Sequence, residues 1–308
     1  MKYLAGIELG GTTCVAAISS LKEPDIMKER QDFDTTEPAS TLKNLVDYFK
    51  RALVKLKIEH FEAIGIASFG PVDLHRSSPT YGHITSTPKP GWQYVDIAGV
   101  FERAFGENCP VVFETDTNAP VSGEVMAANF PASSNVVYVT VGTGVGAGVY
   151  VNGSPVHGLL HPEAGHMIVG RKPGDVFPGS CVFHKDCVEG MVNSKALAAR
   201  ANVQPSELTS LPDSHPVWDT AGYYLGALCV NLTYTVSPDV ILFGGGVMQR
   251  KVIYDSCRKA FKDLIGGYLD VEKFKTDKGL TEYIRPSKFG NNAGIIGALL
   301  LANAAVKN

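Results

Sequence analysis

The chain has 308 residues, of which 44% are hydrophobic and 19% charged, so it can bury substantial cores and favours two domains over one. The net charge is −3, and Lys and Arg nowhere cluster among aromatic residues, which argues against a nucleic-acid partner. No apolar run approaches the roughly 18 residues that would span a bilayer. Glu8 falls where a signal peptide needs its apolar core, so we expect a cytoplasmic protein without a membrane partner.

The N-terminal stretch predicts a β-hairpin with glycines at its bend. Residues 3–7 read as a buried strand, Gly10 and Gly11 as a turn, and residues 13–19 as the returning strand. A bend without side chains exposes its backbone N–H groups, which can bind phosphate oxygens together with the Thr12 hydroxyl. A plain hairpin turn would use the same glycines, so both interpretations stay open here.

The following elements indicate an α/β arrangement. Residues 38–56 carry apolar side chains at helical spacing, and residues 63–67 read as a strand. That strand leads into the turn-rich segment 68–73, which contains Gly70, at a strand end where α/β folds usually place ligand contacts. The irregular loop 81–92 has the prolines and hydroxyls of a loop that contacts a polar ligand, although a loop packed only on the surface would look the same.

A turn that carries a carboxylate follows a helix near residues 96–105 and a strand at residues 111–114. Asp116-Thr117-Asn118 opens another helix, where Asp or Asn commonly serves as an N-cap. A glycine turn at residues 142–146 then joins strands at residues 136–140 and 147–151, which repeats the pattern of the N-terminus. A carboxylate between two phosphate-holding turns favours a kinase, with two similar halves on either side of a ligand cleft.

Residues 160–189 show little periodicity and contain most of the side chains that could bind a metal. Cys181-x-x-His184-x-x-Cys187 places three ligands in one short loop, and His166 can complete a four-coordinate set. Zinc would order this segment, which lacks a core of its own. Two reduced thiols and scattered histidines in a surface loop are the alternative, since a cytosolic disulfide would be unusual.

The C-terminal third predicts a long helix at residues 217–236, ended by Pro238, and an apolar strand at residues 240–243. The strand runs into Gly244-Gly245-Gly246, where the backbone can pass close to a flat ligand such as adenine. A final helix at residues 291–305 has a small-residue face and is expected to fold back onto the N-terminal half. The predicted domains are residues 1–115, completed by 291–308, and residues 116–290 with the 160–189 zinc loop.

Together these motifs resemble the ROK (repressor, open reading frame, kinase) family of sugar kinases, over essentially the whole chain. The motifs are the glycine turn from Glu8 to Thr12, Asp116 to Asn118, Gly142 to Gly146, Glu163-Ala164-Gly165-His166, and Gly244 to Gly246. The resemblance implies a two-domain actin-like (ribonuclease H-like) α/β fold with a cleft between the domains. It also implies ATP-dependent phosphorylation of a hexose, with ATP, Mg²⁺ and Zn²⁺, in a homodimer.

The resemblance assigns roles to individual residues. Asp116 becomes the general base, and the zinc ligands are His166, Cys181, His184 and Cys187. Substrate hydroxyls are held at Gly70, Asn118, Glu163, His166 and Glu189. ATP is held at Gly10, Gly11, Thr12, Gly142, Thr143, Gly144, Gly245 and Gly246. The chain departs from the family pattern at Glu8, where Asp is usual, at Thr115 and Thr117, where Asn and Ala are common, and at His184, where the typical cysteines stand closer together.

Glu8, the segment 84–92 and the Cys-x-x-His-x-x-Cys loop look like the fructokinase branch, which implies D-fructose as the phosphoryl acceptor and fructose 6-phosphate as the product. A glucokinase, mannokinase or N-acetylmannosamine kinase is the alternative within the family. The alternative from another class is a sugar-sensing regulator lacking a DNA-binding domain. A regulator of this family should carry a helix-turn-helix before the first glycine turn, and the first strand already begins at Tyr3.

Overall fold

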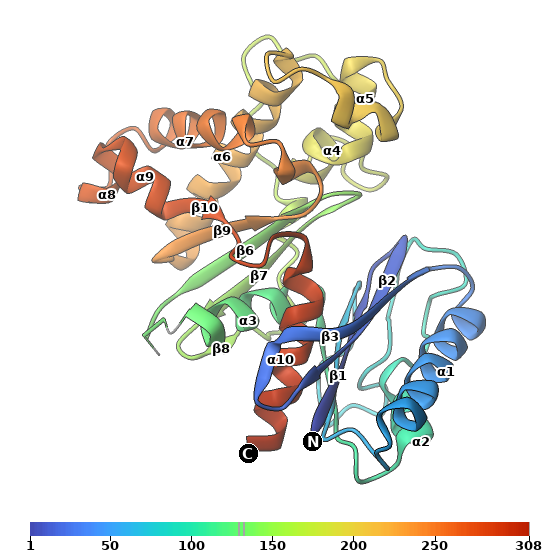
Figure 1. Cartoon of the computed structure of the whole chain (residues 1–308). Coiled ribbons are helices and arrows are strands. Elements are labelled where there is room, and N and C mark those ends of the chain that lie inside the picture. Colours follow the sequence, from blue (N-terminus) through green and yellow to red (C-terminus); the bar gives the residue numbers. More distant parts are fainter. Residues whose placement is uncertain (129, 132, 308) are drawn as a thin grey trace. The chain divides into compact units, whose positions relative to one another are not determined.

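The computed structural model describes residues 1–128, 130–131 and 133–307, and the chain forms two compact units (Figure 1). The first unit comprises Met1–Phe130, Ser154–His161 and Asn292–Asn308, and the second comprises Pro131–Gly153 and Pro162–Asn291. Asn129, Ala132 and Asn308 belong to the predicted domain ranges but lie outside the described residues. Within the described part, no helix has the length and apolar character needed to cross a membrane.

The first unit is built on a mixed five-stranded sheet with the order β3-β2-β1-β4-β5. The predicted hairpin is present, because β1 and β2 pair antiparallel up to Leu9 and Cys14, and β4 then runs parallel to β1. Edge strand β3 was not predicted, since its sequence is mostly charged and lacks an apolar face. The strands are β1 (Tyr3–Leu9), β2 (Thr13–Ser20), β3 (Glu23–Asp34), β4 (Ile64–Ser68) and β5 (Val111–Thr115).

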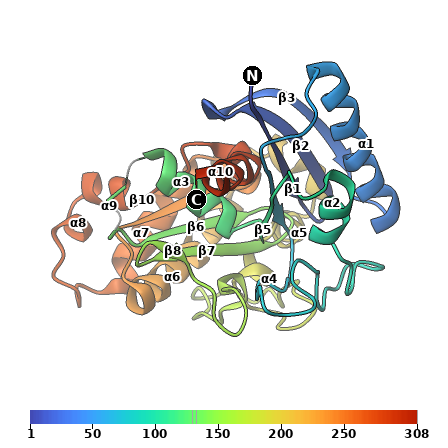
Figure 2. The same ribbon diagram turned by 90° about the horizontal axis from the view of Figure 1, so that it is seen from below.

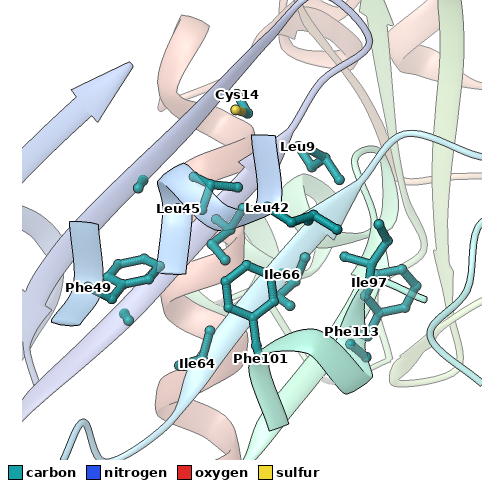
Figure 3. Packing of buried hydrophobic residues seen from close by; sticks show 14 of the residues in the cluster. Leu9, Cys14, Leu42, Leu45, Phe49, Ile64, Ile66, Ile97, Phe101 and Phe113 are labelled. Carbon is teal, nitrogen blue, oxygen red and sulfur yellow. The ribbon is translucent and has the colours of Figure 1, made fainter. Parts of the chain in front are cut away.

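Helices α1 (Pro38–Leu56) and α2 (Ala98–Phe105) cover one face of this sheet. Figure 3 shows Leu45 and Phe49 of α1 with Ile66 of β4 and Phe101 of α2 in one apolar core. All four side chains are fully buried, and burying each is worth about 1.5–3 kcal/mol relative to exposure. This core anchors the sheet whose strand ends carry the predicted site residues.

Helices α3 (Asn118–Ala128) and α10 (Ala293–Lys307) lie side by side on the other face (Figure 2). A Cβ at Gly65 of β4 would lie 1.9 Å from the Ala298 carbonyl oxygen, and one at Gly123 would lie 2.8 Å from the Gly297 Cα. The predicted small-residue face of the last helix is therefore used for close packing. The same packing groups α3 with the first unit, whereas the sequence placed the boundary after residue 115.

The second unit repeats the pattern of hairpin followed by parallel strand. Its sheet has the order β10-β9-β6-β7-β8, in which β6 and β7 form the hairpin and β9 runs parallel to β6. The glycine turn at residues 142–144 joins the two hairpin strands, as predicted. The strands are β6 (Val136–Val141), β7 (Val145–Val151), β8 (Ser154–Pro155), β9 (Val240–Gly244) and β10 (Ile284–Pro286).

Helices α6 (Pro216–Val236) and α7 (Val252–Ile265) pack closely in this unit, since a Cβ at Gly222 would lie 2.3 Å from the Ser256 Cβ. The segment between β8 and α4 contains only one 3₁₀ turn, in agreement with its lack of periodicity. The remaining elements are α4 (Val188–Val192), α5 (Ser194–Ala201), α8 (Glu272–Lys275), α9 (Asp277–Tyr283), and the 3₁₀ turns η1 (Ala164–His166), η2 (Pro205–Ser210), η3 (Val247–Gln249) and η4 (Gly290–Asn292).

Candidate active site and metal centre

Asp116 lies in the turn between β5 and α3. Its backbone N–H donates a hydrogen bond to the Ser68 carbonyl at the end of β4 (2.8 Å), and the Asn118 N–H at the start of α3 donates to the Thr115 hydroxyl (2.9 Å). Because β4 and β5 are parallel, their carboxyl ends meet at one edge of the sheet, the edge where open α/β sheets bind ligands. The structure therefore places Asp116 beside the turn that follows Ser68.

A buried carboxylate that the sequence interpretation missed stands next to this turn. Glu114 is only 4% exposed, and its carboxylate accepts hydrogen bonds from the Thr115 N–H (2.9 Å) and the Asn118 Nδ2 (3.2 Å). Its other oxygen lies 2.7 Å from His157 Nε2, and this hydrogen bond raises the pKa of His157 although partial burial opposes the shift. A charged residue inside the apolar run of β5 was the signal available in the sequence.

The Glu114 contact sets the orientation of the Asn118 amide. Because Nδ2 donates to the carboxylate, Oδ1 is the atom left to accept, and among the described residues no donor lies within hydrogen-bonding distance of it. Asn118 is fully buried. A buried acceptor without a partner costs free energy, so the amide is suited to a ligand hydroxyl.

Gly70 is held against a histidine from a distant segment. A Cβ at Gly70 would lie 3.2 Å from His161 Nε2, and the same nitrogen accepts a hydrogen bond from the Val72 N–H (3.1 Å). His161 is buried. It therefore fixes the turn after β4 and does not join the metal cluster described below.

The first glycine turn is held by hydrogen bonds at Gly10, whereas its tip is exposed. The Gly10 N–H donates to the Thr13 carbonyl (3.2 Å), and the Thr35 hydroxyl donates to the Gly10 carbonyl (2.8 Å). A Cβ at Gly10 would lie 2.6 Å from the Thr13 carbonyl oxygen, whereas one at Gly11 would meet nothing within 4 Å. Gly11 and Thr12 are exposed, so their polar groups can reach a ligand.

The second glycine turn and the later glycine run come together in the second unit. The Gly142 N–H donates to the Gly144 carbonyl (2.8 Å), and the Gly142 carbonyl accepts from the Ser194 N–H (2.8 Å). Gly245 has φ +90°, and a Cβ there would lie 2.4 Å from the Val141 carbonyl oxygen. Only glycine fits this position without strain.

A cavity of about 740 Å³ opens beside these two glycine segments, within the size range of small-molecule sites. Its lining includes Thr143 and Gly246. Its lining also includes Trp218 and Arg250, and the Arg250 guanidinium lies 4.9 Å from the centroid of the Trp218 ring. Arg250 is held there by an ion pair with Asp213. The lining of the cavity thus combines glycine residues with a paired arginine and tryptophan.

The four predicted metal ligands converge in one place. The ligand atoms of His166, Cys181, His184 and Cys187 all lie within 4.8 Å of one another. His166 Nδ1 lies 3.6 Å from Cys187 Sγ and 3.8 Å from Cys181 Sγ, and His184 Nδ1 lies 3.8 Å from Cys181 Sγ. Zinc bonds of about 2.0–2.3 Å require such edge lengths in a tetrahedron, so the donor set and its spacing fit zinc.

Two acidic residues border this centre. Glu189 Oε2 accepts a hydrogen bond from the Val145 N–H (3.0 Å), and a Cβ at Gly144 would lie 2.8 Å from the same oxygen. The predicted sugar ligand Glu189 therefore contacts the second glycine turn. Glu163 is exposed when the whole residue is considered, although its carboxyl group is partly desolvated. This desolvation and the nearby Glu189 carboxylate raise the pKa of Glu163 to about 7.

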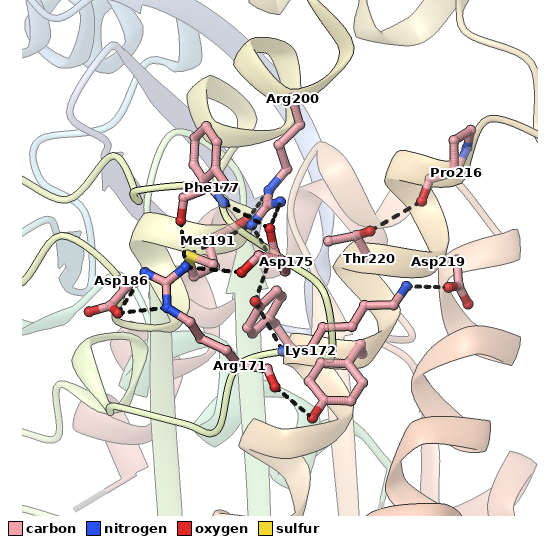
Figure 4. Close-up of polar contacts among 12 residues, drawn as sticks. Arg171, Lys172, Asp175, Phe177, Asp186, Met191, Arg200, Pro216, Asp219 and Thr220 are labelled. Atoms are coloured by element: carbon pink, nitrogen blue, oxygen red, sulfur yellow. Dashed lines mark hydrogen bonds and ion pairs between the residues drawn. The ribbon is translucent and has the colours of Figure 1, made fainter.

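An ion-pair network that the sequence analysis did not find supports the metal-binding segment (Figure 4). Arg200 of α5 donates two hydrogen bonds to the Asp175 carboxylate (2.9 and 2.8 Å), which also accepts from the Tyr224 hydroxyl of α6 (2.5 Å). Arg171 forms an ion pair with Asp186, the residue before Cys187 (2.8 Å). The network ties the irregular segment to α5 and α6.

Comparison with known proteins assigns the chain to a family. The model of the ROK family matches residues 4–305. The chain belongs to the ROK family. Its fold is that of the actin-like ATPases, as predicted, with two mixed α/β units that each contain a five-stranded sheet.

Several relatives of this ROK-family chain match it over nearly the full length. A fructokinase from Zymomonas mobilis is 39% identical over 312 residues, covering 99% of this chain and 97% of that protein. A fructokinase from Pediococcus pentosaceus is 38% identical over 305 residues, covering 99% of each. The crystal structure of a ROK hexokinase from Thermus thermophilus superposes with a TM-score of 0.75 at 25% identity, covering 99% of each chain.

Proposed function

We propose that this ROK-family chain is an ATP-dependent hexose kinase that converts D-fructose to fructose 6-phosphate. The identity of 38–39% to proteins named fructokinases, over the full length, supports the enzyme class and the sugar. The observation that carries the proposal is the position of Asp116, which lies where two parallel strands end and close in sequence to the buried Asn118, whose Oδ1 has no hydrogen-bond partner among the described residues. In phosphoryl transfer to a sugar, a positioned carboxylate can orient the attacking hydroxyl and accept its proton.

Asp116 acts as the general base in this proposal. The sugar hydroxyl gives its proton to the Asp116 carboxylate while its oxygen attacks the terminal phosphorus of ATP, and the bond to the β-phosphate oxygen breaks. Asn118 Oδ1 accepts a second sugar hydroxyl, because Glu114 holds the amide in that orientation. Gly70, Glu163, His166 and Glu189 are the other proposed sugar contacts.

ATP is proposed to bind at the two glycine turns. Its phosphates would be held at Gly10, Gly11, Thr12, Gly142, Thr143 and Gly144, through those backbone N–H groups that do not already donate to the Thr13 and Gly144 carbonyls. The adenosine would enter the cavity beside Gly245 and Gly246, and the volume of this cavity suits a purine. When bound, Mg²⁺ would neutralise part of the negative charge of the phosphates.

Zinc is proposed to be held by His166, Cys181, His184 and Cys187, where it orders the segment around it. His166 presents Nδ1 to the two sulfur atoms, so Nε2 is its remaining polar atom. A metal on Nδ1 keeps the proton on Nε2 and makes it a hydrogen-bond donor for the sugar. The proposed sugar contact and the metal centre therefore share one side chain.

A coupled assay of ADP release over a panel of hexoses tests the proposed function. We expect a higher kcat/KM for fructose than for glucose or mannose, because a hexose that leaves buried polar groups unpaired loses several powers of ten. Asp116→Asn should lower kcat by about 10² to 10⁴ while nucleotide binding is kept. Asp263→Asn, at an exposed position on α7, is the matched control and should leave kcat unchanged.

Equal or higher kcat/KM for glucose or mannose would show that the assignment of fructose is wrong. An Asp116→Asn enzyme with most of its kcat would exclude Asp116 as the base. Absence of ADP release with every hexose would contradict kinase activity itself.

A further inference from the structure

The loop 85–93 is fixed to the first unit on both of its sides. The Trp92 ring is fully buried, its Nε1 donates to the Thr36 carbonyl (2.9 Å), and the Thr85 N–H donates to the Pro71 carbonyl (2.7 Å). Within the loop, the Gln93 side-chain amide donates to the Thr87 carbonyl (3.0 Å). The residues on either side of Lys89 are prolines, which restrict the backbone further. The loop is therefore a rigid support for Lys89.

The Lys89 side chain points to the first glycine turn. Its Nζ donates to the Gly11 carbonyl (2.7 Å) and to the Thr35 carbonyl (3.2 Å). An ammonium group has three N–H donors, so one remains after these two contacts. Both acceptors are uncharged, and within the described ranges no carboxylate forms an ion pair with Lys89. The positive charge is thus not neutralised by the protein.

The charge stands where an anion is expected. Gly11 and Thr12 are exposed, and backbone N–H groups at a glycine turn attract phosphate oxygens. A neutral amide could hold the same two carbonyls, so a clamp on the turn does not by itself require an ammonium group. An ammonium group at this position adds an attraction that a structural clamp would not need.

We propose that Lys89 is a catalytic residue that binds the transferred phosphoryl group at the first glycine turn. The proposal rests on the proposed kinase function. The new bond forms between the sugar oxygen and the terminal phosphorus, and the electron pair of the broken bond stays on the β-phosphate oxygen of ADP. The proton goes to Asp116, and Lys89 remains protonated and donates to an oxygen of the moving phosphoryl group, where negative charge must be stabilised.

Two variants separate the charge from the clamp. Lys89→Gln keeps a donor for the two carbonyls and removes the charge, whereas Lys89→Arg keeps the charge. Lys50→Gln, at an exposed position on α1, is the matched control. Calorimetric titration with Mg·ADP and with Mg·AMPPNP reports the contact directly, because only the second nucleotide carries the terminal phosphoryl group.

We expect Lys89→Gln to weaken Mg·AMPPNP binding about tenfold or more and to leave Mg·ADP binding unchanged, since a charge-assisted hydrogen bond is lost. Lys89→Arg should recover part of this loss, and Lys50→Gln should match the wild type. With fructose, kcat of Lys89→Gln should fall about 10² to 10³-fold with the KM for the sugar unchanged. Lys89→Ala provides a second neutral variant if the Gln side chain prevents folding.

Equal losses for both nucleotides, or no loss for either, would overturn the proposal. A raised KM for fructose with kcat retained would also overturn it, because Lys89 would then bind the sugar. A wild type that phosphorylates no hexose, but whose Mg·AMPPNP affinity depends on Lys89, would contradict the proposed function and leave the phosphate contact established.

Discussion

Replacing Arg200 by Met tests whether the Asp175 network stabilises the second unit (Figure 4). The two side chains are nearly buried, with 11% of Arg200 and 9% of Asp175 exposed, and they share two parallel hydrogen bonds. The guanidinium also stacks 4.2 Å from the centroid of the Phe177 ring. Met keeps much of the aliphatic volume but leaves the Asp175 carboxylate without its cation.

Removal of one partner of a buried ion pair costs about 3–5 kcal/mol, because the other charge stays desolvated. For a unit of this size the midpoint temperature should fall by about 10 °C. Burial alone would raise the pKa of Asp175, but hydrogen bonds from Arg200, Tyr224 and the Phe177 N–H hold it well below its usual value. The interactions that lower this pKa stabilise the folded state at pH values above about 4, the pKa of an aspartate in the unfolded chain. This stabilisation is lost progressively as the pH falls below that value.

Urea unfolding at pH 7 and at several values down to pH 3 measures the loss of unfolding free energy and its dependence on pH. The difference between wild type and Arg200→Met should be largest at pH 5–7 and should shrink below about pH 4. Lys259→Met is the control, because its ion pair with Asp263 is exposed and should leave the stability nearly unchanged. A loss below about 1 kcal/mol in Arg200→Met, or a difference that does not change with pH, would refute the reasoning.

Three further results are expected. Elemental analysis should find one zinc per chain in protein purified without chelator and none in Cys187→Ser, and zinc-free wild type would contradict the metal assignment. His157→Gln should lower the midpoint temperature more at pH 6 than at pH 8. The Glu114 contact raises the pKa of His157, so it stabilises the folded protein fully below about pH 6.5 and less as the pH rises. An equal loss at both pH values would exclude the Glu114 contact as the cause. Desolvation raises the pKa of Glu8 to about 7, although a hydrogen bond from the Ile295 backbone opposes this shift. Glu8→Gln should therefore be more stable than the wild type at pH 8 and equally stable near pH 4. Greater stability of the variant at pH 4 alone would show that the charged form of Glu8 is not the destabilising one.

The sequence alone determined those features that depend on neighbouring residues. Apolar periodicity predicted α1 and α6, and glycines predicted both hairpin turns, because such patterns follow from local backbone preferences. The close spacing of Cys181, His184 and Cys187 predicted a metal loop for the same reason. Strand β3 was missed because a charged edge strand has no apolar alternation to detect.

Only the tertiary structure decided the contacts between residues far apart in the chain. Glu114 meets His157 across 43 positions, and Lys89 meets Gly11 across 78. No local pattern encodes either pair, because each arises when separate strands and loops reach the same edge of one sheet. The division of the chain was decided in the same way, since α3 joins the first unit through a glycine contact with a helix that begins at Ala293. Long-range packing sets such contacts, and each partner alone has the residue pattern of an ordinary strand, loop or helix.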